Sequence, residues 1–285
     1  MIEFCEISKV FNTDLLKKKF QALNNVSFSI PENKIIGFLG ANGAGKTTSI
    51  KIGMDFIRPT SGTIKYGKSL GGSKKEAFKN IGYLPERPYF YPHLTGRDFC
   101  KYLSQLSNVK RTTFNERIDK WAPIFKIDYA LDRYINNYSK GMLQRIGFLA
   151  TIIHNPKLII LDEPLSGLDP IGRKELKDVI VNLYKDGKTV FFSSHIISDV
   201  EEICDSVIFL KNGELVFNGS VDQIISDNIK PETNISYFDD GQVKMIKVQN
   251  TDKSTEIKRI IESGKDIISV HAEKPSLEQI FYNVK

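Results

Sequence analysis

The stretch Gly40-Ala41-Asn42-Gly43-Ala44-Gly45-Lys46-Thr47-Thr48 decides how this chain is interpreted, because it fits the pattern G-x-x-x-x-G-K-[ST]. The run before it, residues 34–39, is short and apolar, which predicts a buried strand. The run after it, residues 47–57, has apolar residues at helical spacing. A strand, a glycine-rich turn and a helix in this order are the context that the pattern requires.

These residue types suit the binding of phosphate groups. Glycines let the backbone turn so that successive N–H groups face inward, and the following helix adds its positive N-terminal end. The Lys46 ammonium would contact the outer phosphates, and the Thr47 hydroxyl would ligate Mg²⁺. The residues of this loop that we expect at the nucleotide are Gly40, Asn42, Gly43, Ala44, Gly45, Lys46, Thr47 and Thr48.

Length and composition set the broader limits. The chain has 285 residues, a net charge of +6 and three scattered cysteines, which predicts a globular protein in a reducing compartment. No apolar run approaches the length of a membrane span, and Glu3 and Glu6 interrupt the first apolar run, which argues against a signal peptide. We therefore expect a cytoplasmic chain. The basic cluster 17–19 is interpreted as a solvated loop, and no nucleic acid partner is expected.

The remaining pattern predicts an α/β protein with an antiparallel part and a helical insertion. Residues 11–22 are interpreted as a polar insertion between two strands, and residues 95–155 as largely helical. The core is expected to end near residue 220, with a small α+β unit over 221–285. Strands are predicted at 2–8, 26–30, 35–39, 63–67, 81–84, 158–161, 189–192, 206–210, 214–217, 242–249 and 266–271.

Two acids follow one of the predicted buried strands. Asp162 and Glu163 come directly after the apolar run 158–161, and such a strand carries its carboxylates to the sheet edge where ligands gather. Asp162 would hold Mg²⁺, and Glu163 would polarise an attacking water as a general base.

A further motif, Asn137-Tyr138-Ser139-Lys140-Gly141-Met142, precedes a strongly apolar helix. Ser139 is a good N-cap, and the free N–H groups of a helix start can bind an anion. Alone, this stretch indicates only helix capping; its place about 20 residues before Asp162 makes it informative.

The order of these motifs resembles that of the ATP-binding-cassette ATPases. It comprises the glycine loop, the Ser139 motif, Leu161-Asp162-Glu163-Pro164, Ser166-Gly167-Leu168-Asp169 and His195. The resemblance covers residues 1–220 and implies a RecA-like P-loop core with an antiparallel β part and a helical subdomain over about 95–155. The stretch 275–281 looks like the tail of bacterial export-type cassettes, such as drug, sodium and bacteriocin exporters.

The resemblance implies a role for each matching residue. Ser139 and Gly141 would grip the γ-phosphate bound to the opposite subunit, and Asp169 would span the dimer interface. His195 would contact the γ-phosphate and hold the attacking water. The implied catalytic residues are therefore Glu163, His195 and Lys46, with ATP and Mg²⁺ as cofactors.

Several positions depart from the family pattern. Lys140 and Met142 replace a glycine and a glutamine of the signature, and Glu86 stands at the Q-loop glutamine, where it becomes a third expected Mg²⁺ ligand beside Thr47 and Asp162. An aromatic side chain near the first strand should stack on adenine. Phe11 is the preferred residue and Phe20 its rival.

The resemblance predicts an ATPase subunit on the inner face of the cell membrane. Two such cassettes would close head to tail on two ATP-Mg²⁺ and drive a separate transmembrane permease, most simply in export. The exposed aromatics 89–91 would meet that partner. One alternative is a soluble cassette acting on ribosomes or nucleic acid. Another, a GTPase, lacks support because Asn33-Lys34 is not followed by the guanine-reading Asp.

Overall fold

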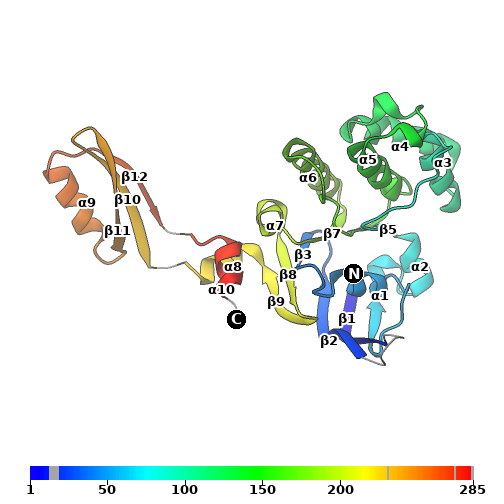
Figure 1. The fold of residues 1–285 in the computed structure, drawn as a ribbon, viewed down its shortest axis with the longest axis horizontal. Helices are drawn as coiled ribbons and strands as arrows, with labels where there is room; N and C mark the ends of the chain where they lie inside the picture. The colour runs from blue at the N-terminus through cyan, green and yellow to red at the C-terminus, as the bar shows by residue number, and fades with distance from the viewer. Residues whose placement is uncertain (13–18, 230, 273, 284–285) are drawn as a thin grey trace. The chain divides into compact units, whose positions relative to one another are not determined.

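The computed structural model describes residues 1–12, 19–229, 231–272 and 274–283. Contacts divide the chain into two compact units, Met1–Gly219 and Ser220–Lys285, and each is described by itself. The first unit holds a three-stranded sheet of order β2-β1-β4 and a six-stranded sheet of order β5-β6-β7-β3-β8-β9 (Figure 1). The strands of this unit are β1 Ile2–Asn12, β2 Lys19–Ile30, β3 Ile35–Leu39, β4 Ser61–Tyr66, β5 Ile81–Leu84, β6 Leu158–Leu161, β7 Thr189–Ser194, β8 Ser206–Lys211 and β9 Glu214–Ser220.

Four neighbouring parallel strands end at the same edge of the larger sheet. β5, β6, β7 and β3 pair in parallel, so that Leu84, Leu161 and Phe192 lie side by side, and Leu39 lies opposite Ser194. The loops that follow these strands therefore emerge together. This register brings the glycine loop, Glu86, the acid pair and His195 to one place although they are far apart in the sequence.

The core of the first unit joins its two sheets. β3 and β6 of the larger sheet are buried along their whole length and rich in Ile and Leu, as expected for parallel strands covered on both faces. A row of aromatic rings crosses from the antiparallel sheet to the parallel one: Phe4 stacks on Phe28 at 4.1 Å, Phe28 lies 5.4 Å from Phe38, and Phe38 lies 5.2 Å from Phe191. This packing holds the antiparallel sheet against the strands that carry the site.

Helices cover the sheets and form the helical segment. α6 and α7 pack against β3 and β7, α5 packs against β5 and α3, and α1 packs against β2. The helices of this unit are α1 Lys46–Gly53, α2 Lys74–Lys79, α3 Gly96–Leu106, α4 Arg111–Ile124, α5 Lys140–Ile152, α6 Pro170–Lys185 and α7 Ile197–Ile203. Trp121, Phe125 and Phe148 form the aromatic centre of the helical segment. The predicted α/β fold with an antiparallel part and a helical segment is confirmed.

The second unit is a small α+β unit. Its sheet has the order β11-β10-β12, all antiparallel, and α9 packs on it through the buried Ile260. Its elements are α8 Val221–Asp227, β10 Glu232–Asp239, β11 Gln242–Gln249, α9 Lys253–Glu262, β12 Ile267–Ala272 and α10 Leu277–Asn283.

The structure corrects the expectation of a polar insertion over 11–22. β1 continues to Asn12 and β2 begins at Lys19, with Phe11 paired to Phe20, while residues 13–18 lie outside the described part. The two strand extensions satisfy each other's backbone hydrogen bonds, which a free loop would leave to water. Among the α-helices and strands, α2 and β10 were not predicted from the sequence.

Candidate active site

The glycine loop connects the end of β3 to the start of α1. Gly43 and Gly45 have φ of +83° and +105°, which side chains rarely adopt. A Cβ on Gly45 would also lie 2.6 Å from Leu23 Cδ2 and 2.8 Å from the Ala22 oxygen. Gly45 caps α1 without a side chain, so no hydroxyl or carboxylate occupies the helix start. The loop can therefore present its N–H groups to an anion.

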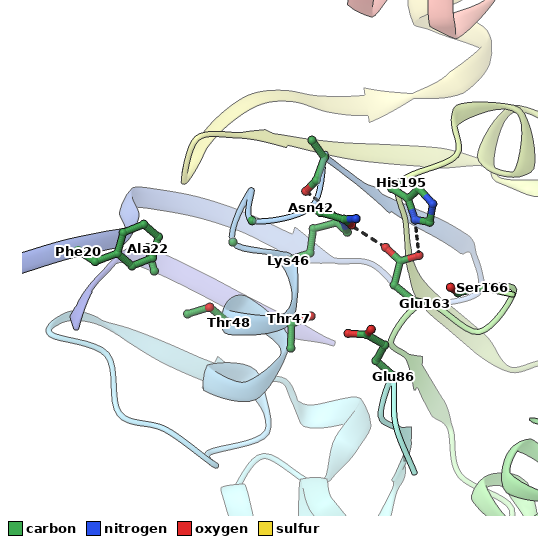
Figure 2. Close-up of a pocket in the computed structure, with 13 residues that line it drawn as sticks. Phe20, Ala22, Asn42, Lys46, Thr47, Thr48, Glu86, Glu163, Ser166 and His195 are labelled. Carbon is green, nitrogen blue, oxygen red and sulfur yellow. Dashed lines mark hydrogen bonds and ion pairs between the residues drawn. The ribbon is translucent and has the colours of Figure 1, made fainter. Parts of the chain in front are cut away.

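A pocket of about 410 Å³ lies over this loop. Figure 2 shows that its lining comes from the β2 strand, the glycine loop and the ends of the neighbouring parallel strands. The lining residues are Phe20, Ala22, Ala41, Asn42, Gly43, Gly45, Lys46, Thr47, Thr48, Glu86, Glu163, Ser166 and His195. Gly40 and Ala44 do not line it: the Gly40 oxygen accepts a hydrogen bond from Lys46 Nζ, and Ala44 is buried.

Glu163 lies between the two other residues predicted to be catalytic (Figure 2). Its Oε1 is 3.2 Å from Lys46 Nζ, and its Oε2 is 2.8 Å from His195 Nδ1. Lys46 is 6% exposed and also donates to the Gly40 oxygen at 2.6 Å. Sequence-distant groups thus form one charged cluster, Lys46–Glu163–His195, at the sheet edge.

Ser193 organises the acid pair, a role that was not predicted from the sequence. Its hydroxyl donates to Asp162 Oδ1 at 2.7 Å and accepts from the backbone N–H of Glu163 at 2.8 Å. The backbone of Glu163 has φ of +51°, a conformation that costs about 1–3 kcal/mol in a non-glycine residue and is concentrated at functional sites. The parallel register, with Leu161 beside Phe192, places the next residues of both strands together and explains this contact.

Asp162 is suited to hold a metal ion. The side chain is 1% exposed, and its Oδ2 has no hydrogen-bond partner among the described residues. Burial raises the pKa of Asp162, the hydrogen bond from Ser193 opposes this, and the nearby Glu86 and Glu163 raise it further. A cation would relieve this cost, and the donors nearby are all oxygen, the ligand type that Mg²⁺ prefers. The oxygen atoms of Asp162, Thr47 and Glu86 therefore fit a Mg²⁺ ion by their chemistry.

No all-protein metal cage is present in the described part of the chain. These residues include no group of three or more His, Cys, Asp or Glu side chains placed to bind a metal by themselves.

The structure brings Phe20, and not Phe11, to the pocket. Phe20 lines the pocket beside Ala22 and is 55% exposed (Figure 2). Phe11 lies opposite Phe20 on β1, but its ring is covered by the Lys9 ammonium at 5.0 Å. The pocket lining therefore contains Phe20, the rival, and not Phe11, the residue preferred from the sequence for stacking on adenine.

Ser139, Gly141 and Asp169 lie outside the pocket lining. Ser139 is exposed and caps α5 by accepting from the Met142 N–H at 3.3 Å. Asp169 is exposed and caps α6 by accepting from the Gly172 N–H at 3.0 Å. The Lys140 side chain lies against Gly167. A Cβ added at Gly167 would lie 1.9 Å from Nζ of Lys140. We call Ser139, Gly141 and Asp169 the signature surface.

The three aromatic residues at 89–91, which follow Glu86, differ in exposure: one packs against the helical segment and another is largely exposed. Phe90 packs against Phe99 of α3 at 5.2 Å, whereas Tyr89 is 77% exposed. Tyr91 lies 5.5 Å from Tyr89 and 5.8 Å from Tyr102. The exposed part of this group is thus a surface of tyrosines.

The fold and site together define a P-loop nucleotide-binding cassette, and comparison with known proteins agrees. A family model described as "ABC transporter" matches residues 23–166. An uncharacterized ABC transporter ATP-binding protein of Synechocystis is 38% identical over 232 residues, covering 80% of this chain and 65% of that protein. The Bacillus subtilis protein YhaQ, of the same description, is 31% identical over 279 residues, covering 92% and 93%. The chain belongs to the ABC transporter ATP-binding family.

Other relatives and structures extend this result. The bacitracin transport ATP-binding protein BcrA of Bacillus licheniformis is 34% identical, covering 79% of this chain and 74% of BcrA. A solved ATP-binding subunit of an ABC transporter superposes with a TM-score of 0.69 at 26% identity, covering 80% of this chain and 92% of the other. A dimeric cassette bound to ADP and Pi shares the fold, with a TM-score of 0.68 at 22% identity, covering 78% and 99%. The matched region spans about two thirds of the first relatives, 65% and 66%.

The sequence did not single out every residue of this pocket. Ala22 and Ser166 line it, and Ser193 supports it, yet none was predicted to do so.

Within the described residues, no helix is both long and apolar enough to cross a membrane.

Proposed function

We propose that this chain binds and hydrolyses ATP as the ATP-binding subunit of a transporter, and that it drives a separate transmembrane permease. The observation that carries the proposal is Glu163, which is held between Lys46 and His195 at the mouth of a phosphate-binding loop. Phosphates bound by the loop would compete for Lys46 and leave Glu163 paired with His195. That pair can orient a water beside the γ-phosphate.

In this proposal each residue of the pocket has a separate task. Lys46 and the loop N–H groups bind the phosphates, and Phe20 stacks on adenine. Asp162, Thr47 and Glu86 would hold Mg²⁺, which when bound neutralises charge on the phosphate oxygens. Glu163 accepts a proton from the water, and His195 fixes the position of Glu163 and of that water.

The proposal includes a second cassette, most simply a second copy of this chain. Ser139 is exposed and Gly141 is half-buried, and both lie at the start of α5 outside the lining of their own pocket, where this helix start could complete the pocket of another chain. The solved cassette bound to ADP and Pi is described as dimeric, which supports this arrangement. Head-to-tail closure would bury two nucleotides.

Export is the direction we propose. Support comes from BcrA, which is named for bacitracin transport, and from the similarity of residues 275–281 to export-type cassettes. The tyrosine surface, Tyr89 with Tyr91, would contact the permease, because exposed aromatics close to a catalytic loop are typical of interaction sites.

Two measurements test this function. Purified chain with ATP and Mg²⁺ should release phosphate, and Glu163→Gln should stop release while giving an ATP-dependent dimer in sedimentation.

Tagged chain from detergent-solubilised membranes should recover a partner with several spanning segments, and Tyr89→Ala should weaken that recovery. Recovery of ribosomes or nucleic acid in place of a membrane protein would overturn the transporter assignment and leave the ATPase chemistry standing.

A further inference from the structure

A buried ion pair connects α6 to α7. Arg173 of α6 pairs with Oδ2 of Asp199 on α7, and Lys177 lies 3.8 Å from the other carboxylate oxygen. Asp199 is 3% exposed. A carboxylate is buried at this level only when cations or hydrogen bonds compensate the lost water, so the two basic side chains are part of a built contact.

Each end of this pair lies four residues along the chain from a predicted functional residue. Asp199 comes four residues after His195, at the start of α7. Arg173 comes four residues after Asp169, and the N–H of Arg173 donates to the Asp169 oxygen at 3.0 Å. The ion pair therefore links the segment of His195, through the first residues of α7, to the segment of Asp169, through the first turn of α6.

α7 depends on such contacts for its position. It has seven residues, and its N-cap Ile196 makes no side-chain cap. Helices of this length are not stable by themselves and are held by tertiary packing. Val200, the residue after Asp199, packs closely on Gly37 of β3. A Cβ added at Gly37 would lie 2.4 Å from Cγ1 of Val200. Val200 packs α7 against the sheet, and two acids of α7 pair with α6: Asp199 with Arg173, and Glu202 with Lys177.

We propose that the Arg173–Asp199 pair is a positioning contact that sets where His195 stands relative to Glu163 and to the Asp169 end of α6. That this contact matters for turnover rests on the proposed function, ATP hydrolysis. A buried ion pair is weak evidence for stability, because its attraction is largely offset by desolvation. Placement of a group that must lie 2.8 Å from Glu163 is a more demanding requirement, since errors of about 1 Å cost up to about 100-fold in rate.

The first test is a double-mutant cycle on turnover. Asp199→Asn should lower kcat about tenfold and leave the KM for ATP within about twofold, because His195 shifts while the phosphate loop does not. In a His195→Ala background the same substitution should change kcat by less than about twofold. Asp132→Asn, which breaks the exposed pair with Arg97, is the matched control and should change neither value.

The second test reads His195 directly. The chain has four histidines, so ring-¹⁵N-labelled protein should give four assignable imidazole signals, with His195 identified by His195→Gln. Asp199→Asn should move the His195 signal and leave those of His93 and His271 in place. Arg173→Lys keeps the charge but loses the guanidinium fork, and it should move the same signal by less, which covers the case in which Asp199→Asn does not fold.

An equal fall of kcat in both backgrounds, or an unmoved His195 signal in folded Asp199→Asn and Arg173→Lys, would overturn the proposal. Failure of the proposed function is distinguishable from this. If the unmodified chain releases no phosphate from ATP, the ATPase assignment fails, and the imidazole spectrum still decides whether the ion pair positions His195.

Discussion

The pocket and the signature surface differ in how their polar groups are satisfied. In the pocket, Lys46, Glu163 and His195 are paired with one another, and Asp162 is buried. On the signature surface, Ser139 and Asp169 are exposed and make only the hydrogen bonds of helix caps. In the proposed function the pocket supplies the groups that act on phosphate and water, and the signature surface supplies an exposed helix start. The proposed site would then be half built in a single chain.

The largest effect is expected at the centre of the pocket. Glu163→Gln removes the proton acceptor, so turnover should fall by about 10²- to 10⁴-fold while ATP still binds. Phosphate release and equilibrium binding of a fluorescent ATP analogue measure the two quantities. Asp186→Asn, at an exposed ion pair with Lys120, is the control and should be close to unmodified protein. Substantial turnover in Glu163→Gln would place the water-activating group elsewhere.

A second prediction concerns the signature surface. Ser139→Ala should lower turnover about 100-fold, as expected for the loss of one donor to the transferring phosphate, without changing ATP binding to the dilute single chain. Ser73→Ala is a matched control, because Ser73 caps α2 at the same distance of 3.3 Å. Both substitutions should cost similar stability, about 1 kcal/mol. If Ser139→Ala weakened nucleotide binding to the isolated chain, the division between the two regions would be wrong.

A smaller effect is expected at the adenine end of the pocket. Phe20→Ala should weaken ATP binding about tenfold, because base stacking on an aromatic ring is worth about 1–3 kcal/mol. Phe11→Ala, its cross-strand neighbour, should change the affinity by less than about twofold. Titration with ATP and with a triphosphate that lacks the base separates stacking from phosphate contacts. The reverse order of the two variants would restore Phe11 as the stacking residue.

The smallest effect concerns stability and pH. The pKa of Asp162 is raised by burial, so the folded state binds its proton more tightly than the unfolded state does. The free energy of unfolding therefore falls as pH rises from the ordinary value of 3.8 through the raised pKa. Asp162→Asn should not lose this stability. At pH 7 without metal, its melting temperature should be a few degrees higher than that of the unmodified chain, and ATP with Mg²⁺ should raise it by less. A lower melting temperature for metal-free Asp162→Asn would contradict this reading of the buried carboxylate.

The parts of the site that sequence predicts are those set by parallel strands. Buried apolar runs are easy to recognise, and the residues after Leu39, Leu161 and Ser194 must emerge at one edge whatever the details of packing. Phe20 was a different case. Phe11 and Phe20 are directly paired across β1 and β2, so both side chains take the same face of the sheet, and alternation along the strands does not distinguish them. Of the two, Phe20 lines the pocket, which local sequence does not show.

Two missed elements had weak signals for separate reasons. β10 alternates Thr233, Ile235 and Tyr237 toward one face, but its charged and amide residues obscure the pattern. α2 is only six residues long, although Ser73 followed three residues later by Glu76 is a capping-box pattern. Short elements of this kind are fixed by what they pack on.

The most direct test of a site split between two chains is to mix two inactive variants. Lys46→Ala disables the pocket of its own chain, and Ser139→Arg blocks the signature surface that serves the other chain. Mixed dimers contain one intact composite site, so the equimolar mixture should recover up to about a quarter of unmodified turnover, where each variant alone has almost none. A mixture that stays as inactive as its two components, while both variants remain folded and dimerise, would contradict the account.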